Sequence, residues 1–249
     1  MWRDSSGRTL SEYPHPSVAV DVALLTVVWA ERRGTLSVLL HRPESGFAAG
    51  QWCLPGVMVQ MQELLSDAAL RALRDKGGVT GDAPRQLKVF DALDRDERGR
   101  VLSVAHVDVV PEVRPAESES RVLAPISGDR ARPPGRQRRL PYDHDLIVSE
   151  AVAWARSAYG RRADPFGLLG KEFTLSDLQK VHEAVAGVAF VKDTFRRAFS
   201  EYLVPTGGER TGSVGRPAAL YRHMTRVERH EHRRQREERR ALGRRSRPD

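Results

Sequence analysis

The chain has 249 residues, 40% of them apolar, which is enough for two modest domains that each bury a core. Its net charge of +8 favours polyanionic partners such as nucleic acid. Its one cysteine, Cys53, excludes an intramolecular disulfide, and its longest apolar run, residues 18–30, is shorter than the roughly 20 residues that span a bilayer. The N-terminal extension, residues 1–17, has no signal-peptide pattern. We therefore expect a soluble cytoplasmic protein with no membrane partner.

Two strands and a helix are predicted first. Residues 18–30 and 35–41 are rich in Val, Leu and Thr and flank the turn-like sequence ERRG, which is typical of two strands of one sheet. After a loop marked by Gly and Pro, apolar residues recur at helical spacing. Ser66 or Asp67 is expected to cap this helix, and the glycine pair at 77–78 to end it.

The next segments predict a second strand pair, a long loop and another helix. Residues 86–93 and 101–111 alternate in polarity around a charged turn, as half-buried strands do. Residues 111–141 are rich in Pro, Arg and Ser and are expected to form a long surface loop. A helix is predicted over residues 143–159. Its expected apolar stripe comprises Leu146, Ile147, Ala151, Trp154 and Ala158.

A motif at residues 54–79 resembles the signature of Nudix hydrolases, G-x5-E-x7-R-E-U-x-E-E-x-G-U, in which U is aliphatic. The matching residues are Glu63, Arg71, Leu73, Gly78 and Val79. The departures are Val57 for the first Gly, Ala72 for the first helical Glu, and Asp75 and Lys76 for the Glu pair. The resemblance covers residues 18–160 and implies an α/β (α+β) fold, a mixed-sheet α/β/α sandwich.

The departures fall where the family binds magnesium. Positions 72, 75 and 76 are spaced i, i+3 and i+4, so we expect one helix face to present them together. Magnesium takes oxygen ligands in an octahedral array, and here one carboxylate, Asp75, remains beside the repelling ammonium of Lys76. Val57 also adds a branched side chain where the backbone is expected to turn closely around phosphate. We therefore expect no bound metal and no catalytic residue.

A site without metal chemistry leaves two interpretations of this helix. It either serves packing alone or still holds a nucleotide diphosphate, with Lys76 supplying the positive charge. Arg42, Arg95 and Arg98 lie in loops near the expected cleft and are the other predicted ligand contacts. For each of these arginines, a solvated loop charge is the alternative.

Residues 172–223 predict a winged helix-turn-helix. Thr174 and Asp177 are spaced as a capping box before a helix that Gly187 ends. In the second helix, Val191, Phe195, Phe199 and Tyr202 are expected to face inward. The predicted DNA contacts are Lys192, Thr194, Arg196 and Arg197 on this helix, in the major groove, and Arg210 and Arg216 in a glycine-rich hairpin, on phosphates. A solvated basic helix in a docking domain is the alternative.

Together, the Nudix-like segment, FTLSDLQKVHEAV, FRRAF, LVPTG and GRPAALYR resemble the Nudix-related transcriptional regulator (NrtR) family over residues 18–223, with residues 161–171 as linker. The resemblance implies a non-catalytic Nudix domain that senses ADP-ribose, without a required cofactor, and a winged helix that represses genes of NAD metabolism. A homodimer on a palindromic DNA operator is expected. The rivals are a magnesium-dependent pyrophosphohydrolase, for which Glu63 and Asp75 suffice, and a nonspecific nucleic-acid-binding protein.

The tail, residues 224–249, holds ten arginines and five carboxylates. With almost no apolar residues, it is expected to form a frayed helix, supported by pairs such as Glu228 with His232, or no fixed structure. It either adds nonspecific DNA affinity or only solubility.

Overall fold

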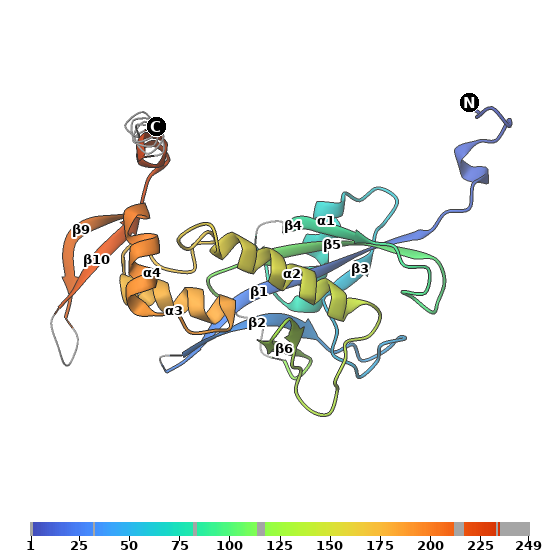
Figure 1. Ribbon diagram of the computed structural model, residues 1–249. Coiled ribbons are helices and arrows are strands. Elements are labelled where there is room, and N and C mark those ends of the chain that lie inside the picture. Colours follow the sequence, from blue (N-terminus) through green and yellow to red (C-terminus); the bar gives the residue numbers. More distant parts are fainter. Residues whose placement is uncertain are drawn as a thin grey trace, which may run out of the picture. The chain divides into compact units, whose positions relative to one another are not determined.

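The chain forms two compact units in a computed structural model (Figure 1). The first unit comprises residues 1–29 and 35–155, and the second comprises residues 30–34 and 156–249. The boundary falls within the helix α2. The structure describes residues 2–31, 33–81, 84–113, 118–211, 217–232 and 234.

The first unit is built on a mixed sheet of seven described strands. The strands are β1 (Ser17–Ala30), β2 (Arg33–His41), β3 (Gly56–Met58), β4 (Arg85–Phe90), β5 (Val101–Val109), β6 (Arg121–Ser127) and β7 (Arg130–Ala131). Their order is β4-β5-β1-β2-β6-β7, with β3 antiparallel to β1. Strands β1 and β5 are parallel, while β4 with β5 and β2 with β6 are antiparallel. Both predicted strand pairs are therefore confirmed.

Strand β1 has helices on both of its faces. Alternate β1 residues join α1 (Leu65–Ala72) in a core cluster whose buried members are Val20, Val22, Leu24, Leu39, Ala68, Ala69, Ala72, Leu73 and Val113. On the opposite face, Asp21 meets His144, the first residue of α2 (His144–Tyr159). Because successive strand residues point to opposite faces, this arrangement is the predicted α/β/α sandwich.

The helix of the Nudix-like motif begins and continues differently from the prediction. Its N-cap is Leu64, so the expectation of a cap at Ser66 or Asp67 is wrong. Glu63 accepts hydrogen bonds from Gln60 and Arg71, which fixes the loop just before the helix and starts it earlier. A π-helix over Leu73–Gly77 follows α1 and ends at Gly78. Gly78 has a φ of 65°, which confirms the predicted glycine end.

The segment 111–141 is not one long loop, because it contains β6 and β7. Strand β6 pairs with β2 in the register Val38↔Ala124 and with β7 on its other side, and the basic, Pro-rich flanks had hidden it from the sequence pattern. In α2 the buried stripe comprises Ile147, Val148, Ala151, Val152, Ala155 and Tyr159. The prediction of an inward Leu146 is wrong: its side chain is 61% exposed.

The second unit is a winged helix. Its elements are β8 (Phe173–Thr174), α3 (Leu175–Ala186), α4 (Lys192–Phe199), a 3-10 turn (Ser200–Tyr202), β9 (Leu203–Arg210) and β10 (Ala218–His223). The sheet order is β8-β10-β9, and its strand residues Phe173 and Leu203 form one core with Leu178 of α3 and Phe195 of α4. The capping box of Thr174 and Asp177 and the glycine end at Gly187 are confirmed.

The start of α4 and the two ends of the chain hold smaller features. Val191 is the N-cap of α4 and is 73% exposed, so its predicted inward position is wrong. A short 3-10 helix spans Leu10–Glu12, and residues 226–232 of the tail are helical. In that helix Glu228 pairs with Arg222 at 2.8 Å instead of the expected His232. No helix among the described residues is long and apolar enough to cross a membrane.

Candidate functional site

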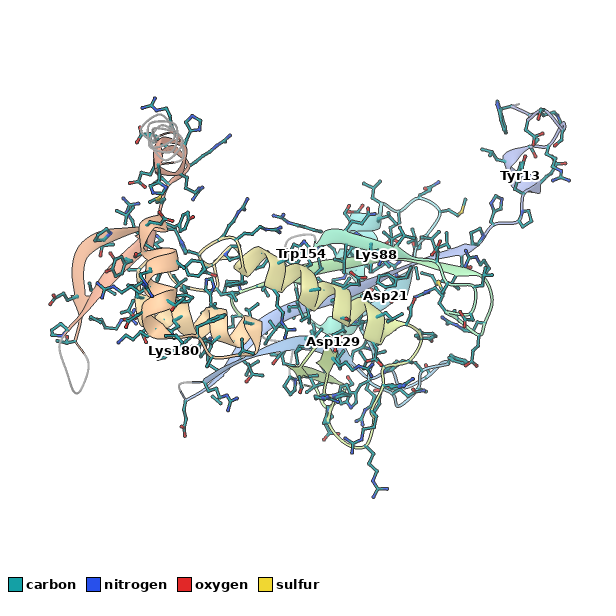
Figure 2. All side chains as sticks on the ribbon, viewed as in Figure 1. Tyr13, Asp21, Lys88, Asp129, Trp154 and Lys180 are labelled. Carbon is teal, nitrogen blue, oxygen red and sulfur yellow. The ribbon has the colours of Figure 1, made fainter. Side chains whose placement is uncertain are left out.

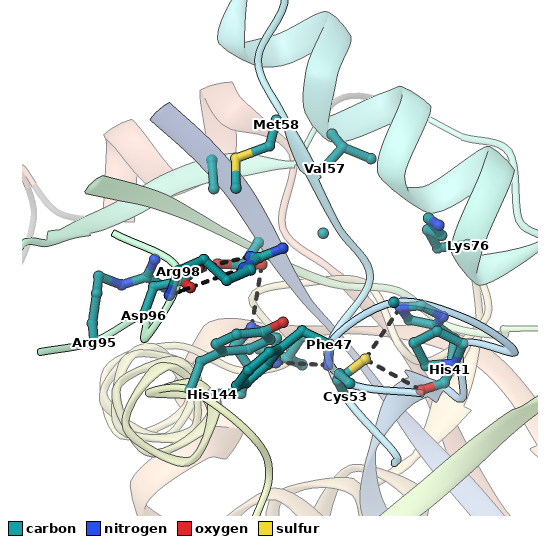
Figure 3. A pocket seen from close by; sticks show the side chains of 18 of the residues that line it. His41, Phe47, Cys53, Val57, Met58, Lys76, Arg95, Asp96, Arg98 and His144 are labelled. Carbon is teal, nitrogen blue, oxygen red and sulfur yellow. Dashed lines mark hydrogen bonds and ion pairs between the residues drawn. The ribbon is translucent and has the colours of Figure 1, made fainter. Parts of the chain in front are cut away.

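A polar cleft of about 210 Å³ opens on the first unit (Figure 3). Its floor comes from β1 and β2, and its walls come from β3, the loops around residues 43–48 and 95–98, the π-helix and the start of α2. The cleft therefore combines residues from both ends of the Nudix-like segment.

The floor of the cleft is a buried network of ionised groups. Asp21 accepts a hydrogen bond from the Ser103 hydroxyl at 2.6 Å, and His144 Nε2 lies 3.3 Å from its second oxygen. Arg95 donates Nε and Nη2 to the two oxygens of Asp143, at 2.9 and 2.7 Å, and lies 3.4 Å from Asp21. The backbone N–H of Leu54 donates to Nδ1 of His144, so the proton of this imidazole is on Nε2, the atom that faces Asp21. The network positions Arg95 with both carboxylates satisfied.

The ionised form of Asp21 depends on its partners. Burial favours the neutral acid, but His144, Ser103 and Arg95 outweigh burial and hold the pKa of Asp21 below its ordinary value. Gly56 keeps room for this carboxylate: a Cβ there would lie 2.0 Å from Oδ1 of Asp21. Gly56 is thus a position where the backbone approaches a side chain closely, whereas the expected close turn around phosphate at Val57 stays a prediction.

One end of the cleft is cationic. Lys76 lines it, and within the described residues its ammonium has neither an ion pair nor a hydrogen bond. Below it lie His41 and Cys53, whose Nε2 and Sγ are 3.3 Å apart. Burial, assisted by Lys76, lowers the pKa of His41 to about 4, and burial raises the pKa of Cys53 to about 12. Both side chains are thus uncharged at neutral pH, and the buried thiol is a poor nucleophile.

The other end of the cleft is aromatic. The rings of Phe47 and Tyr142 have centroids 5.9 Å apart, and the guanidinium carbon of Arg98 lies 5.3 Å from the centre of the Tyr142 ring. Arg98 is held by two hydrogen bonds to Asp96, at 2.7 and 2.9 Å, and this contact lowers the pKa of Asp96. A flat, partly exposed surface beside a cation suits stacking of a planar ring.

The degenerate metal positions do not share one face. Ala72 is fully buried in the core, the Asp75 carboxylate pairs with Arg74 at 2.9 Å, and Lys76 lines the cleft. The expectation of one common face is wrong, because the π-helix that begins at residue 73 changes the angular spacing.

The remaining signature carboxylate has another role. Glu63 is held by Arg71 through two 2.7 Å contacts, and this pairing lowers the pKa of Glu63 to about 2. Among the residues that the structure describes, no three His, Cys, Asp or Glu side chains are grouped to hold a metal ion. The donor set present does not fit the magnesium ion that the Nudix signature implies.

Three of the four predicted ligand contacts line the cleft: Lys76, Arg95 and Arg98. Arg42 is not among the lining residues, because its guanidinium lies over Trp52, 5.1 Å from the ring centre. The sequence reasoning missed Asp21, Phe47, Tyr142 and His144 as lining residues. A charged residue within the apolar run 18–30 was the available signal for Asp21.

The predicted DNA-contacting residues of α4 lie on its exposed surface. Lys192, Thr194, Arg196 and Arg197 are exposed, while Phe195 is buried in the winged-helix core. Arg210, at the end of β9, forms a 2.7 Å ion pair with Asp177, so a phosphate contact requires that pair to be shared or broken. Arg216 lies outside the described residues.

Known proteins are similar to both units of the chain. The family of NrtR DNA-binding winged helix domains matches residues 165–223. The chain is 27% identical over 221 residues to the ADPR responsive transcriptional repressor NtrR of Acinetobacter baylyi, covering 85% of this chain and 84% of that protein. It is also 27% identical over 143 residues to an ADP-ribose pyrophosphatase of Methanocaldococcus jannaschii, covering 57% of this chain and 76% of the enzyme.

A solved structure is similar to this chain over most of its length. NrtR of Shewanella oneidensis, in complex with a 27mer DNA, matches with a TM-score of 0.61 and 27% identity, over 83% of this chain and 93% of that one. The predicted fold, a Nudix-like domain followed by a winged helix, is thereby confirmed. Residues 165–223 are an NrtR-type winged helix, and the chain as a whole is similar to NrtR of S. oneidensis.

Proposed function

We propose that this chain is a transcriptional repressor whose first unit binds ADP-ribose and whose second unit binds operator DNA. The observation that carries the proposal is the presence, in one chain, of an NrtR-type winged helix and a Nudix-like unit with an accessible cationic cleft. The similarity to the A. baylyi repressor, which is named as ADPR-responsive, spans both units. Control of genes of NAD metabolism and a homodimeric state remain expectations from the resemblance.

The two ends of the cleft suit the two ends of a nucleotide. The unpaired ammonium of Lys76 supplies a positive charge for a diphosphate. In hydrolases a metal ion supplies this charge. The aromatic surface of Phe47 and Tyr142, with Arg98 beside it, suits an adenine ring. Arg95 lines the cleft but is already committed to Asp143 and Asp21, so it serves mainly to hold the floor.

We further propose that the first unit does not hydrolyse its ligand. The former metal positions hold a buried methyl group, an ion-paired carboxylate and an ammonium, which support no magnesium site. The rival, a pyrophosphohydrolase with a relaxed metal site, is favoured by the similarity to the M. jannaschii enzyme. Incubating the full chain with ADP-ribose and Mg²⁺ or Mn²⁺ and quantifying AMP separates the two. Turnover of about one per second or faster, within the ordinary enzyme range, would refute the non-catalytic assignment.

Coupling between ligand and DNA is the direct test of the proposed repressor. A duplex selected by the full chain from a randomised library provides the operator, and fluorescence anisotropy gives its dissociation constant with and without ADP-ribose. A ligand that prefers the DNA-free state weakens DNA binding by roughly 5- to 150-fold, the range of typical coupling energies. Calorimetric titration of ADP-ribose with and without the duplex must give the same factor. Equal DNA affinities at saturating ADP-ribose would contradict the proposal.

A further inference from the structure

We propose that the first unit carries its own phosphate-contacting surface, the arginine loop of residues 130–139, which binds the backbone of duplex DNA. The loop reads RARPPGRQRR and holds five arginines and no carboxylate. None of the five belongs to the described residues that line the cleft, so the loop is separate from the proposed ligand site. The inference rests on the proposed function in one respect: duplex DNA is the polyanion that the second unit is proposed to bind.

The backbone of the arginine loop is fixed at several points. Strand β7 pairs with β6, and the N–H of Arg132 donates to the carbonyl of Pro125 at 2.8 Å. The side chain of Gln137 bridges both backbone groups of Trp52, accepting from its N–H at 2.7 Å and donating to its carbonyl at 2.8 Å. Ala131 and Leu140 are buried at the two ends of the loop. The loop is therefore anchored, although its composition is that of a solvated segment.

The guanidinium groups of the loop are exposed and uncompensated. Arg132, Arg136, Arg138 and Arg139 are exposed, and no ion pair or hydrogen bond joins their side chains to another described residue. Figure 2 shows the side chains of this loop, near the labelled Asp129, extending away from the ribbon. Asp129 itself accepts a hydrogen bond from Ser149 at 3.0 Å.

Several arginines elsewhere in the described chain are paired with carboxylates. Arg71 pairs with Glu63, Arg95 with Asp143, Arg98 with Asp96, Arg210 with Asp177 and Arg222 with Glu228. The arginine loop thus differs from these sites in holding several like charges close together without a counter-charge. Such a group repels itself, and an external row of phosphates relieves the repulsion while releasing counterions. Because the backbone is already fixed, binding orders only the side chains.

The test removes three charges from the loop and measures the salt dependence of DNA binding. The variant Arg136→Ala/Arg138→Ala/Arg139→Ala, in the full chain, is titrated with a 30-base-pair duplex of random sequence at several NaCl concentrations. Each lost phosphate contact lowers the slope of log K against log [NaCl] by about 0.9, so the slope flattens by up to roughly 2.7. ADP-ribose affinity stays at the parent value. The triple Lys variant at the same positions retains the parent slope, which separates charge from folding.

A matched control removes three exposed charges from the same unit outside the loop: Arg3→Ala/Arg8→Ala/Arg85→Ala. This control keeps the parent slope if contact, rather than net charge, is responsible. Equal flattening in both triple Ala variants overturns the inference, as does loss of ADP-ribose binding with an unchanged DNA slope. If the loop variant has the same slope of log K against log [NaCl] as the parent, this inference alone is refuted. If the parent protein itself binds no duplex, the proposed repressor function is refuted as well.

Discussion

Replacing Arg95 tests whether the floor of the cleft depends on its buried ion network. The Arg95 side chain is 3% exposed, and the side chains of its partners Asp143 and Asp21 are 9% and 8% exposed. In Arg95→Met a chain of similar length remains, but both carboxylates lose their cation. Removing one partner of a buried ion pair costs about 3–5 kcal/mol because the remaining charge is uncompensated. We expect the free energy of unfolding of the first unit to fall by this amount at pH 7.

Intrinsic tryptophan fluorescence in urea measures this loss in the right unit. All four tryptophans of the chain, residues 2, 29, 52 and 154, belong to the first unit, so their signal follows its unfolding. Arg74→Met is the matched control: its ion pair with Asp75 is half exposed, and it is expected to cost at most about 1 kcal/mol. A loss in Arg95→Met no larger than in this control would refute the argument.

The pH dependence of the loss has a defined sign. In the parent the pKa of Asp21 is lowered, so its stabilising contribution is present above the ordinary carboxyl value and is lost as the pH falls through the folded-state pKa. Without Arg95 the buried carboxylate favours its neutral form, which is available in acid. The difference between parent and Arg95→Met is therefore expected to shrink from pH 7 toward pH 4. A difference that grows in acid would contradict this account of the network.

Three further substitutions address the cleft and the DNA surface. Lys76→Glu places a negative charge beside the diphosphate and is expected to weaken ADP-ribose binding at least tenfold by calorimetry, about 1.4 kcal/mol, with DNA affinity unchanged; parent-like ADP-ribose affinity would exclude this end of the cleft. Arg196→Ala or Arg197→Ala is expected to weaken operator binding by about 1–3 kcal/mol in anisotropy if the side chain contacts a guanine edge, and two parent-like variants would remove α4 from the groove. Gly56→Ala forces a Cβ against Asp21, 2.0 Å from its oxygen, and is expected to cost about 1–3 kcal/mol in urea unfolding; an unchanged midpoint would mean that the backbone there shifts freely.

Periodicity and turn chemistry predicted the fold well. The strands at 17–30 and 33–41, the capping box of Thr174 and the glycine ends at Gly78 and Gly187 all follow local rules, which the structure confirms. Local rules failed where a contact with a distant segment determines the secondary structure. Strand β6 forms because β2 is available as a pairing partner, and no pattern within residues 121–127 predicts it.

The site was less predictable than the fold because it is assembled from distant segments. Lys76, Arg95 and Arg98 line one cleft, yet Asp21 and His144, which organise its floor, are 123 positions apart in the sequence. The orientation of the degenerate metal positions depended on a π-helix, and helical spacing alone cannot reveal that feature. Residue types thus indicated which charges line the cleft, while the partners that hold those charges in place required the structure.

The loss of metal ligands and the proposed sensing role are connected by thermodynamics. Reciprocal coupling between a ligand and DNA is an equilibrium property, and it requires that the ligand persist while it is bound. A first unit that hydrolysed ADP-ribose would consume its own effector, so occupancy would follow turnover instead of concentration. In the proposed sensor, Ala72, buried in the core, replaces a carboxylate of the Nudix signature, and Lys76, exposed in the cleft, supplies a charge for the diphosphate. The same two positions that weaken the case for an enzyme are therefore the ones that an equilibrium sensor needs.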